Sequence, residues 1–289
     1  VALAFAHAWL KGSAELKQAP NLAVFAVLAA VVLVACAYRL HYSIGRDRRR
    51  TWRVDHLVTE THDTTTLVVS RREGPGPFAR RRAGQFAIIR VRRGNRWSEP
   101  HPFTISAPPG TEELQFTIKA GGRFTSAIPS LAPGTPVLCE GPYGVFTLEP
   151  DRETEIVMIS GGVGVAPFLC HIRHARRIAP GTRIVLLCAN KSPADIIARD
   201  ELAAVAAATE LRVVHILSQT EPDALPEGAP GVTFESGRVS EDLLARHVPS
   251  ADASFYFCGP PPMQSAVLHG LEQRHGVRPS RVHRELFFY

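Results

Sequence analysis

The chain has 289 residues, of which 45% are hydrophobic and 21% are charged, and its net charge is +6. This composition excludes a long disordered protein, and the length is enough for two domains of about 100 to 200 residues each. The five cysteines are far apart, with no C-x-x-C pair and no histidine at zinc spacing, which argues against a structural zinc, an iron–sulfur cluster and a disulfide framework.

The first part of the chain is strongly apolar. It begins at Val1 inside the phrase VALAFAHAWL, so we expect a fragment of a longer protein. Residues 22–40 carry no charge before Arg39, and about 20 apolar residues are what a helix needs to cross a bilayer. The pattern predicts a transmembrane helix over residues 21–43, with the end of a preceding helix and an external loop over residues 1–20. A long buried core helix is the alternative.

Basic residues follow this apolar run. The arginines of residues 46–53 predict, by the positive-inside rule, a location in the cell membrane with the later domains in the cytoplasm. We expect membrane lipids rather than nucleic acid to contact them, because they lie beside the expected span. His7 is either a ligand of a membrane haem or an interfacial histidine in contact with water.

In the rest of the chain the pattern of expected secondary structure changes once. Residues 44–149 contain short β-rich runs broken by turn residues, which predicts an antiparallel β-barrel domain. From residue 150 to residue 289 strand-like and helix-like segments alternate, which predicts an α/β domain with a parallel sheet covered on both faces.

A glycine-rich turn opens the second domain. SGGVGVAP, residues 160–167, lies between an expected strand and an expected helix. There the glycines Gly161, Gly162 and Gly164 allow backbone N–H groups to approach a pyrophosphate at the helix N-terminus. The turn lacks the G-K-[ST] ending of a P-loop, so ATP hydrolysis is not indicated.

Three further segments supply groups suited to a nucleotide cofactor. HPFTIS, residues 101–106, offers an aromatic face and two hydroxyls at strand spacing, and GGRFTSAI, residues 121–128, adds glycines, an arginine and two more hydroxyls. CGPPPM, residues 258–263, follows the last strongly apolar strand, at the sheet edge where open α/β folds bind ligands. Taken singly, each segment is ordinary strand or turn chemistry.

Together and in this order, HPFTIS, FTIK, GGRFTSAI, EGPYG, SGGVGVAP, CGPPPM and a terminal aromatic resemble the ferredoxin–NADP reductase superfamily. Within it the chain is similar to the ferric reductase and NADPH oxidase branch, whose members carry haem-bearing membrane helices before the flavin domain. The resemblance covers nearly all of residues 52–289. It implies a β-barrel that binds FAD, an α/β domain that binds NADPH or NADH, and haem b in the full membrane protein, with His7 as a candidate iron ligand.

The resemblance also assigns residues around the flavin. Phe103 resembles the aromatic packed near the isoalloxazine, and Thr104 the hydroxyl near flavin N5. His101 stands where many relatives have arginine, which weakens one diphosphate contact that Arg123 is expected to replace. The expected FAD-binding residues are His101, Pro102, Phe103, Thr104, Ser106, Gly122, Arg123, Thr125 and Ser126.

On the nucleotide side, the resemblance places Tyr289, or Phe288 if the natural chain continues, over the flavin until nicotinamide displaces it. It places Cys258 beside the nicotinamide. Thr104, Cys258 and Tyr289 are thus the expected catalytic group. Ser218 and Arg238 are positioned to receive a 2′-phosphate, which favours NADPH, although Gln219 and Glu221 lie nearby. The expected nucleotide-binding residues are Gly161, Gly162, Gly164, Pro167, Ser218, Arg238, Cys258, Gly259 and Pro260.

The resemblance implies an oxidoreductase that moves electrons from NAD(P)H through FAD to membrane haem. The final acceptor is ferric iron, dioxygen or a redox protein. Two alternatives stay open: a haem-free, membrane-tethered reductase that serves a separate redox protein, and a non-catalytic nucleotide-binding sensor or assembly subunit. In the first two readings catalysis consists mainly of positioning, because the cofactors supply the chemistry.

Overall fold

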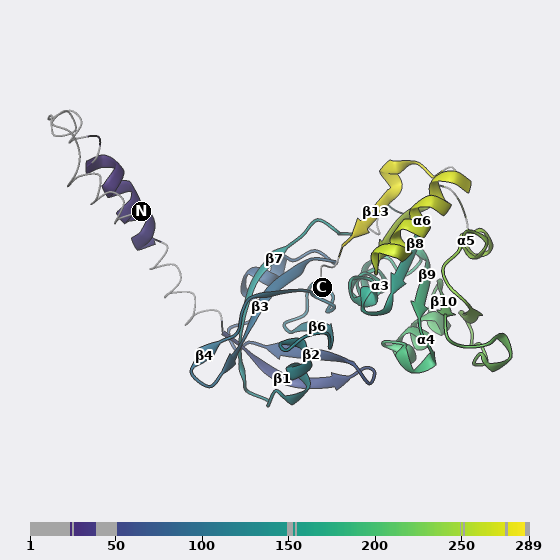
Figure 1. The fold of residues 1–289 in the computed structure, drawn as a ribbon, viewed down its shortest axis with the longest axis horizontal. Helices are drawn as coiled ribbons and strands as arrows, with labels where there is room; N and C mark the ends of the chain where they lie inside the picture. The colour runs from purple at the N-terminus through teal and green to yellow at the C-terminus, as the bar shows by residue number, and fades with distance from the viewer. Residues whose placement is uncertain are drawn as a thin grey trace. The chain divides into compact units, whose positions relative to one another are not determined.

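The computed structural model describes residues 24, 26–38, 51–148, 153, 155–248, 250, 252–274 and 277–286. The chain divides into two units, Val1–Thr51 and Trp52–Tyr289. The second unit contains two β-sheets, which hold the predicted functional segments (Figure 1).

The predicted location in the membrane is wrong. No helix among the described residues has both the length and the apolar character that crossing a bilayer requires. Residues 26–38 are helical, and the rest of the expected span apart from residue 24 lies outside the described residues. Residues 1–23 and 39–50, which include His7 and most of the first arginine cluster, lie outside the described residues.

The first sheet is antiparallel, as predicted, and forms a curled half-barrel. Its strand order is β4-β3-β7-β1-β2-β6, with β5 paired to β3. Two 3-10 turns, η2 (Gly76–Arg80) and η3 (Thr125–Ser130), connect strands. The strands are β1 (Thr51–Thr59), β2 (Thr64–Ser70), β3 (Phe86–Arg93), β4 (Arg96–Trp97), β5 (His101–Thr104), β6 (Leu114–Lys119) and β7 (Pro136–Tyr143).

Alternation of apolar and polar residues builds the core of this domain. In β3, Ala87, Ile89 and Val91 are fully buried, whereas Arg90 and Arg92 are exposed. A strand places successive side chains on opposite faces, so one face of β3 joins the core and the other carries charge. Trp52 and Phe78 meet edge to face in that core, with ring centroids 5.8 Å apart.

The second sheet is parallel throughout, as predicted. Its order is β11-β10-β9-β8-β12-β13. The strands are β8 (Glu155–Gly161), β9 (Arg183–Asn190), β10 (Leu211–Leu217), β11 (Val232–Ser236), β12 (Ser254–Cys258) and β13 (Val282–Glu285). Because parallel strands end at one edge, the turns after β8, β10, β11 and β12 lie along the same side of the sheet.

Helices cover both faces of this sheet. Helices α3 (Ala166–Ile178) and α4 (Arg199–Ala208) pack on the face that carries Ile156 and Met158 of β8. Helices α5 (Glu241–His247) and α6 (Pro261–Arg274) pack on the face that carries Val157 and Ile159. The nearly continuous apolar sequence of β8 follows from this burial on both sides. Short 3-10 turns are η4 (Gly162–Val165), η5 (Pro193–Asp195), η6 (Pro222–Ala224) and η7 (Pro279–Arg281).

Candidate functional site

A stack of three aromatic rings lies where the sequence predicts the flavin. Strand β5 pairs with β3, and its alternation puts His101 and Phe103 on the same face. Phe124 stacks on His101, with ring centroids 4.0 Å apart and planes 22° apart, and lies nearly parallel to Phe103 at 6.1 Å. Flat parallel rings of this kind form a platform for a heteroaromatic ring. The sequence reasoning missed Phe124, although it lies within the GGRFTSAI segment.

His101 is poorly suited to neutralise a diphosphate. Burial lowers its pKa, and Glu99 only partly opposes the shift. The imidazole is therefore mainly neutral at pH 7, as expected where histidine replaces arginine. Arg123 is exposed on the neighbouring turn, and its expected replacement of the missing positive charge stays a prediction.

The turn that carries Arg123 is open on its outer side. An added Cβ at Gly121 or Gly122 would meet no atom within 4 Å. The Thr125 hydroxyl oxygen accepts hydrogen bonds from the N–H groups of both glycines, at 2.9 and 3.0 Å, and so holds the turn in shape. Ser126 is exposed on the same turn. These features fit a diphosphate laid against the turn.

Two predicted hydroxyls have different surroundings. Thr104 is 8% exposed at the end of β5. Ser106 is fully buried, and its hydroxyl lies 3.2 Å from the Thr117 hydroxyl inside the barrel domain. The side chain of Ser106 thus contributes to the protein's internal hydrogen bonding.

The glycine-rich turn lies between β8 and α3, as predicted. Gly162 has φ of +54°, a left-handed conformation that favours glycine, and an added Cβ there would meet no atom within 4 Å. Pro167 lies in the first turn of α3, which contains no acidic residue. The open turn leads into a helix N-terminus whose positive dipole end is not neutralised by an acidic side chain of the first turn. This arrangement fits the pyrophosphate of a nicotinamide nucleotide.

Two of the predicted segments touch each other. Gly164 lies against the backbone of Cys258, and an added Cβ would overlap that residue's carbonyl group. Gly161 similarly lies against Pro260, whose Cδ would be 2.7 Å from an added Cβ. The close approach of the turns after β8 and β12 explains why both need glycine, and it joins the two segments predicted to hold the nucleotide.

Cys258 ends β12 as a buried thiol. Burial raises its pKa, and the neighbouring Glu285 raises it further, so the sulfur is protonated and is not a nucleophile at neutral pH. Glu285 is paired with Cys258 in register on β13, and burial raises its pKa too. The buried Gln264 side chain donates to the carbonyl oxygens of Gly259 and Glu285, both at 2.9 Å. Sequence reasoning missed Glu285 and Gln264, because only the parallel pairing of β12 with β13 brings them to this turn.

The candidate 2′-phosphate residues follow adjacent strands. Ser218 comes directly after β10 and Arg238 shortly after β11, and the register pairs Leu217 with Ser236. Both Ser218 and Arg238 are exposed. The Ser218 hydroxyl lies 3.3 Å from the Asn190 carbonyl oxygen. The structure thus puts the two side chains at one sheet edge, and their role in choosing between NADH and NADPH stays a prediction. The expected Tyr289 lies outside the described residues.

Two family models match the chain, one for each sheet. Residues 51–147 match the FAD-binding domain, and residues 158–269 match the oxidoreductase NAD-binding domain. The matched ranges contain the aromatic stack and the glycine-rich turn respectively. These two matches confirm the prediction that the cofactors are FAD and a nicotinamide nucleotide.

Two of the similar curated proteins are named as reductases. The chain is 31% identical over 228 residues to the reductase component of propane 2-monooxygenase from Mycolicibacterium goodii, covering 76% of this chain and 63% of the relative. It is 27% identical to NADH-cytochrome b5 reductase 2 of Mycosarcoma maydis, covering 78% and 65%. It thus spans less than two thirds of either relative. The FAD/NAD-binding domain of nitric oxide dioxygenase from Vibrio cholerae has the same fold, with a TM-score of 0.71, 21% identity, and coverage of 82% of this chain and 98% of that one.

Proposed function

Because the chain belongs to the ferredoxin–NADP reductase superfamily, we propose that it takes hydride from NADH or NADPH onto bound FAD and passes the electrons singly to a redox protein. The observation that carries the proposal is the pair of fitting sites: an aromatic stack beside an open diphosphate turn, and a glycine turn locked against Cys258. FAD, when bound, would supply the conversion from two-electron to one-electron transfer.

The residues of the first domain orient the flavin. The stack of His101, Phe103 and Phe124 would hold a ring system by its face, while Arg123 and the glycine turn would hold the diphosphate. Thr104 ends β5 with a mostly buried hydroxyl available to hydrogen-bond the reactive edge of the ring. No general base is needed, since hydride transfer depends chiefly on the alignment of donor and acceptor.

The residues of the second domain orient the nucleotide. Gly162 and the start of α3 would hold the pyrophosphate, and the turn from Cys258 to Pro260 would flank the nicotinamide. The protonated, buried Cys258 thiol packs as a small neutral group there, so its proposed role is to shape the contact.

The proposed acceptor is a redox protein rather than ferric iron or dioxygen. Two of the similar proteins are, by their names, a reductase component of an oxygenase and a cytochrome b5 reductase. Both names describe a reductase that serves a partner. A nucleotide-binding sensor, in contrast, would bind the nucleotide without oxidising it.

The test is anaerobic mixing of the FAD-loaded chain with NADH or with NADPH while flavin absorbance is followed. We expect the flavin to bleach with at least one nucleotide within seconds, and the faster one identifies the donor. Tight binding of either nucleotide with no bleaching would instead support the sensor.

Replacing Phe124 tests the flavin stack. We expect Phe124→Ala to raise the Kd for FAD about tenfold, because stacking on an aromatic side chain contributes about 1 to 3 kcal/mol. Phe124→Tyr keeps a flat ring and should bind FAD within about twofold of wild type. Equilibrium dialysis of the apoprotein measures both constants, and equal FAD affinity in the alanine variant would exclude stacking by Phe124.

The β3–β4 hairpin carries a cluster of positive charge where we propose that the acceptor protein docks. Its exposed side chains Arg90, Arg92, Arg93 and Arg96 make no ion pair with a carboxylate in the part of the chain that the structure describes. Arg93 lies over the Phe124 ring, 6.0 Å from its centroid, so the basic hairpin borders the flavin stack. An acidic protein would therefore be drawn toward the flavin.

Charge reversal on this hairpin should slow electron delivery to an acidic protein. We expect the double variant Arg92→Glu and Arg96→Glu to lower kcat/KM for cytochrome b5 about tenfold at low ionic strength, with most of the difference lost in about 0.5 M salt. Reduction of a neutral quinone is the control and should keep its rate. A salt-independent loss, or an equal loss with the quinone, would rule out electrostatic docking here.

A further inference from the structure

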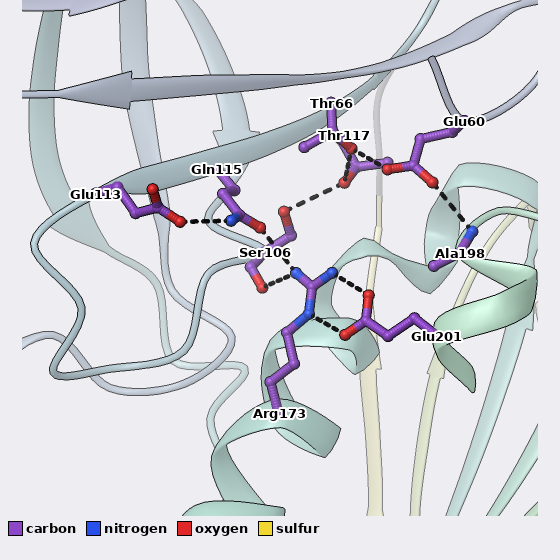
Figure 2. A network of polar contacts seen from close by, with 9 residues as sticks. All are labelled: Glu60, Thr66, Ser106, Glu113, Gln115, Thr117, Arg173, Ala198 and Glu201. Atoms are coloured by element: carbon purple, nitrogen blue, oxygen red, sulfur yellow. Dashed lines mark hydrogen bonds and ion pairs between the residues drawn. The ribbon is translucent and has the colours of Figure 1, made fainter. Parts of the chain in front are cut away.

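A polar network joins the FAD-binding domain to the NAD-binding domain beside the start of α4 (Figure 2). Two links of this network cross between the domains. One runs from Arg173 of α3 to the Ser106 carbonyl group, and the other from Glu60 to the backbone of Ala198. Contacts of Cys170 with Ala107, Arg177 with Pro109 and His62 with Asp195 also join the two domains. We call Glu60, Arg173 and Glu201 the latch.

Arg173 uses its whole guanidinium group in the first link. Its Nε and Nη2 donate to the two carboxylate oxygens of Glu201 at 2.7 and 2.6 Å. Its Nη1 donates to the Ser106 carbonyl oxygen at 2.8 Å and to Gln115 Oε1 at 3.1 Å. Burial would lower the pKa of Arg173, but Glu201 raises it above its ordinary value, so the side chain stays charged. One rigid, planar group therefore holds both domains.

Glu60 makes the second link from the end of β1. One of its carboxylate oxygens accepts a hydrogen bond from the Ala198 N–H at 3.1 Å, and the other accepts one from the Thr66 hydroxyl at 2.6 Å. Ala198 has φ of +52° and directly precedes α4. A carboxylate at this position also interacts favourably with the helix dipole.

Buried hydroxyls connect the two links inside the barrel domain. Thr66 and Thr117 lie 3.0 Å apart, and Thr117 lies 3.2 Å from the Ser106 hydroxyl. The network therefore begins at the residue before α4, passes through the barrel domain, and returns to Glu201 in the first turn of α4. A closed set of contacts of this kind restricts rotation of one domain against the other.

Only a short stretch of chain separates each end of the first link from a proposed cofactor site. Arg173 lies on α3, which begins directly after the glycine turn η4. Ser106 comes two residues after Thr104, the last residue of β5. A shift at the latch therefore moves the nucleotide turn relative to the flavin strand.

From this geometry we propose that Arg173 and Glu60 are positioning residues, which hold the two domains at the angle that aligns the nicotinamide with the flavin. The proposal rests on the proposed function. Neither residue touches a reacting atom, so its effect is on the hydride transfer rate rather than on FAD binding. Misplacement by about 1 Å can cost about 100-fold in rate.

The experiment compares Arg173→Met and Arg173→Lys with wild type, and uses Arg183→Met as a matched control. Arg183 pairs with Glu155 at 3.5 Å within the NAD-binding domain. Anaerobic stopped-flow measures flavin reduction by saturating NADH or NADPH, whichever reacts, and by 1-benzyl-1,4-dihydronicotinamide, which lacks the nucleotide part and needs no domain alignment. We expect the limiting nucleotide rate to fall about 10- to 100-fold in Arg173→Met and less in Arg173→Lys.

The rate with the benzyl compound, the Kd for FAD and the Arg183→Met rates should stay within about twofold of wild type. An equal loss with both donors, or no loss with the nucleotide, would overturn the proposal. Hydrogen exchange of the Ala198 amide gives a second readout without turnover, and we expect it to accelerate at least tenfold in Glu60→Ala, which removes the acceptor of that amide. If neither nucleotide reduces the wild-type flavin, the proposed function fails, and unchanged Ala198 exchange in Glu60→Ala would show separately that the second link of the latch does not exist.

Discussion

Gly164→Ala is expected to abolish most nucleotide-dependent flavin reduction. The alanine Cβ would overlap the Cys258 carbonyl group, whose carbon would lie 2.7 Å away, and would lie 3.1 Å from Gly259 Cα. These are backbone atoms, so the turns after β8 and β12 must move apart. Overpacking of this kind lowers the free energy of unfolding by about 1 to 3 kcal/mol. Here the displaced turns are the ones proposed to bind the nucleotide. Stopped-flow reduction and urea unfolding of the variant would measure the two effects.

Gly181→Ala is the matched control for this substitution. Gly181 lies in the turn before β9 of the same domain, and an added Cβ would meet no atom within 4 Å. Its flavin reduction rate and unfolding free energy should stay close to those of wild type. A Gly164→Ala protein with wild-type stability and nucleotide KM would show that the two turns are not in the described contact.

Acid is expected to destabilise the second domain through two buried histidines. Burial lowers the pKa of His171 to about 4, although the carbonyl groups of Ala83 and Phe146 partly oppose the shift. Burial lowers the pKa of His215 to about 4, and Arg199 lowers it further. In the unfolded chain a histidine has a pKa of about 6.5, so between pH 6.5 and pH 4 the unfolded state binds more protons. Stability therefore falls as the pH drops, by about 2 kcal/mol for each histidine between pH 7.5 and pH 5.

His171→Gln isolates this contribution. His171 is packed among aromatic rings, with centroids 5.8 Å from Phe146 and 6.0 Å from Tyr256. Glutamine does not titrate, so we expect the loss of unfolding free energy between pH 7.5 and pH 5 to shrink by about 2 kcal/mol relative to wild type. His269→Gln, at an exposed position on α6, is the matched control for the substitution itself. An unchanged pH dependence in His171→Gln would mean that this histidine is protonated in the folded protein.

Much of the fold follows from local patterns. Alternating residues in β3 and the nearly continuous apolar run of β8 distinguish a half-buried strand from a fully buried one. The turn at Gly161–Gly164 combines glycine with a strand-to-helix boundary, so its position and ligand class were predictable. The location in the membrane was predicted from an apolar run alone, and no helix among the described residues has the length and apolar character that crossing a bilayer requires.

The missed parts of the site depend on distant contacts. Ser106 is predicted to bind the cofactor, and only the structure shows that its hydroxyl also lies beside Thr117. Arg173 is 67 residues from Ser106 and 28 from Glu201, and no periodic pattern links them. Glu285 reaches Cys258 only through the pairing of β12 with β13. Such contacts are set by how the sheets and helices pack, which a single sequence does not show.

The number of electrons passed on for each nucleotide oxidised distinguishes an electron-transfer flavoprotein from a nucleotide sensor. The FAD-loaded chain is mixed anaerobically with a limiting amount of its nicotinamide donor and an excess of cytochrome b5, and both absorbances are followed. We expect flavin to bleach first and two molecules of cytochrome b5 to be reduced for each nucleotide oxidised. A nucleotide that binds while flavin stays oxidised, or a reduced flavin that passes no electrons to the protein acceptor, would contradict the proposed function.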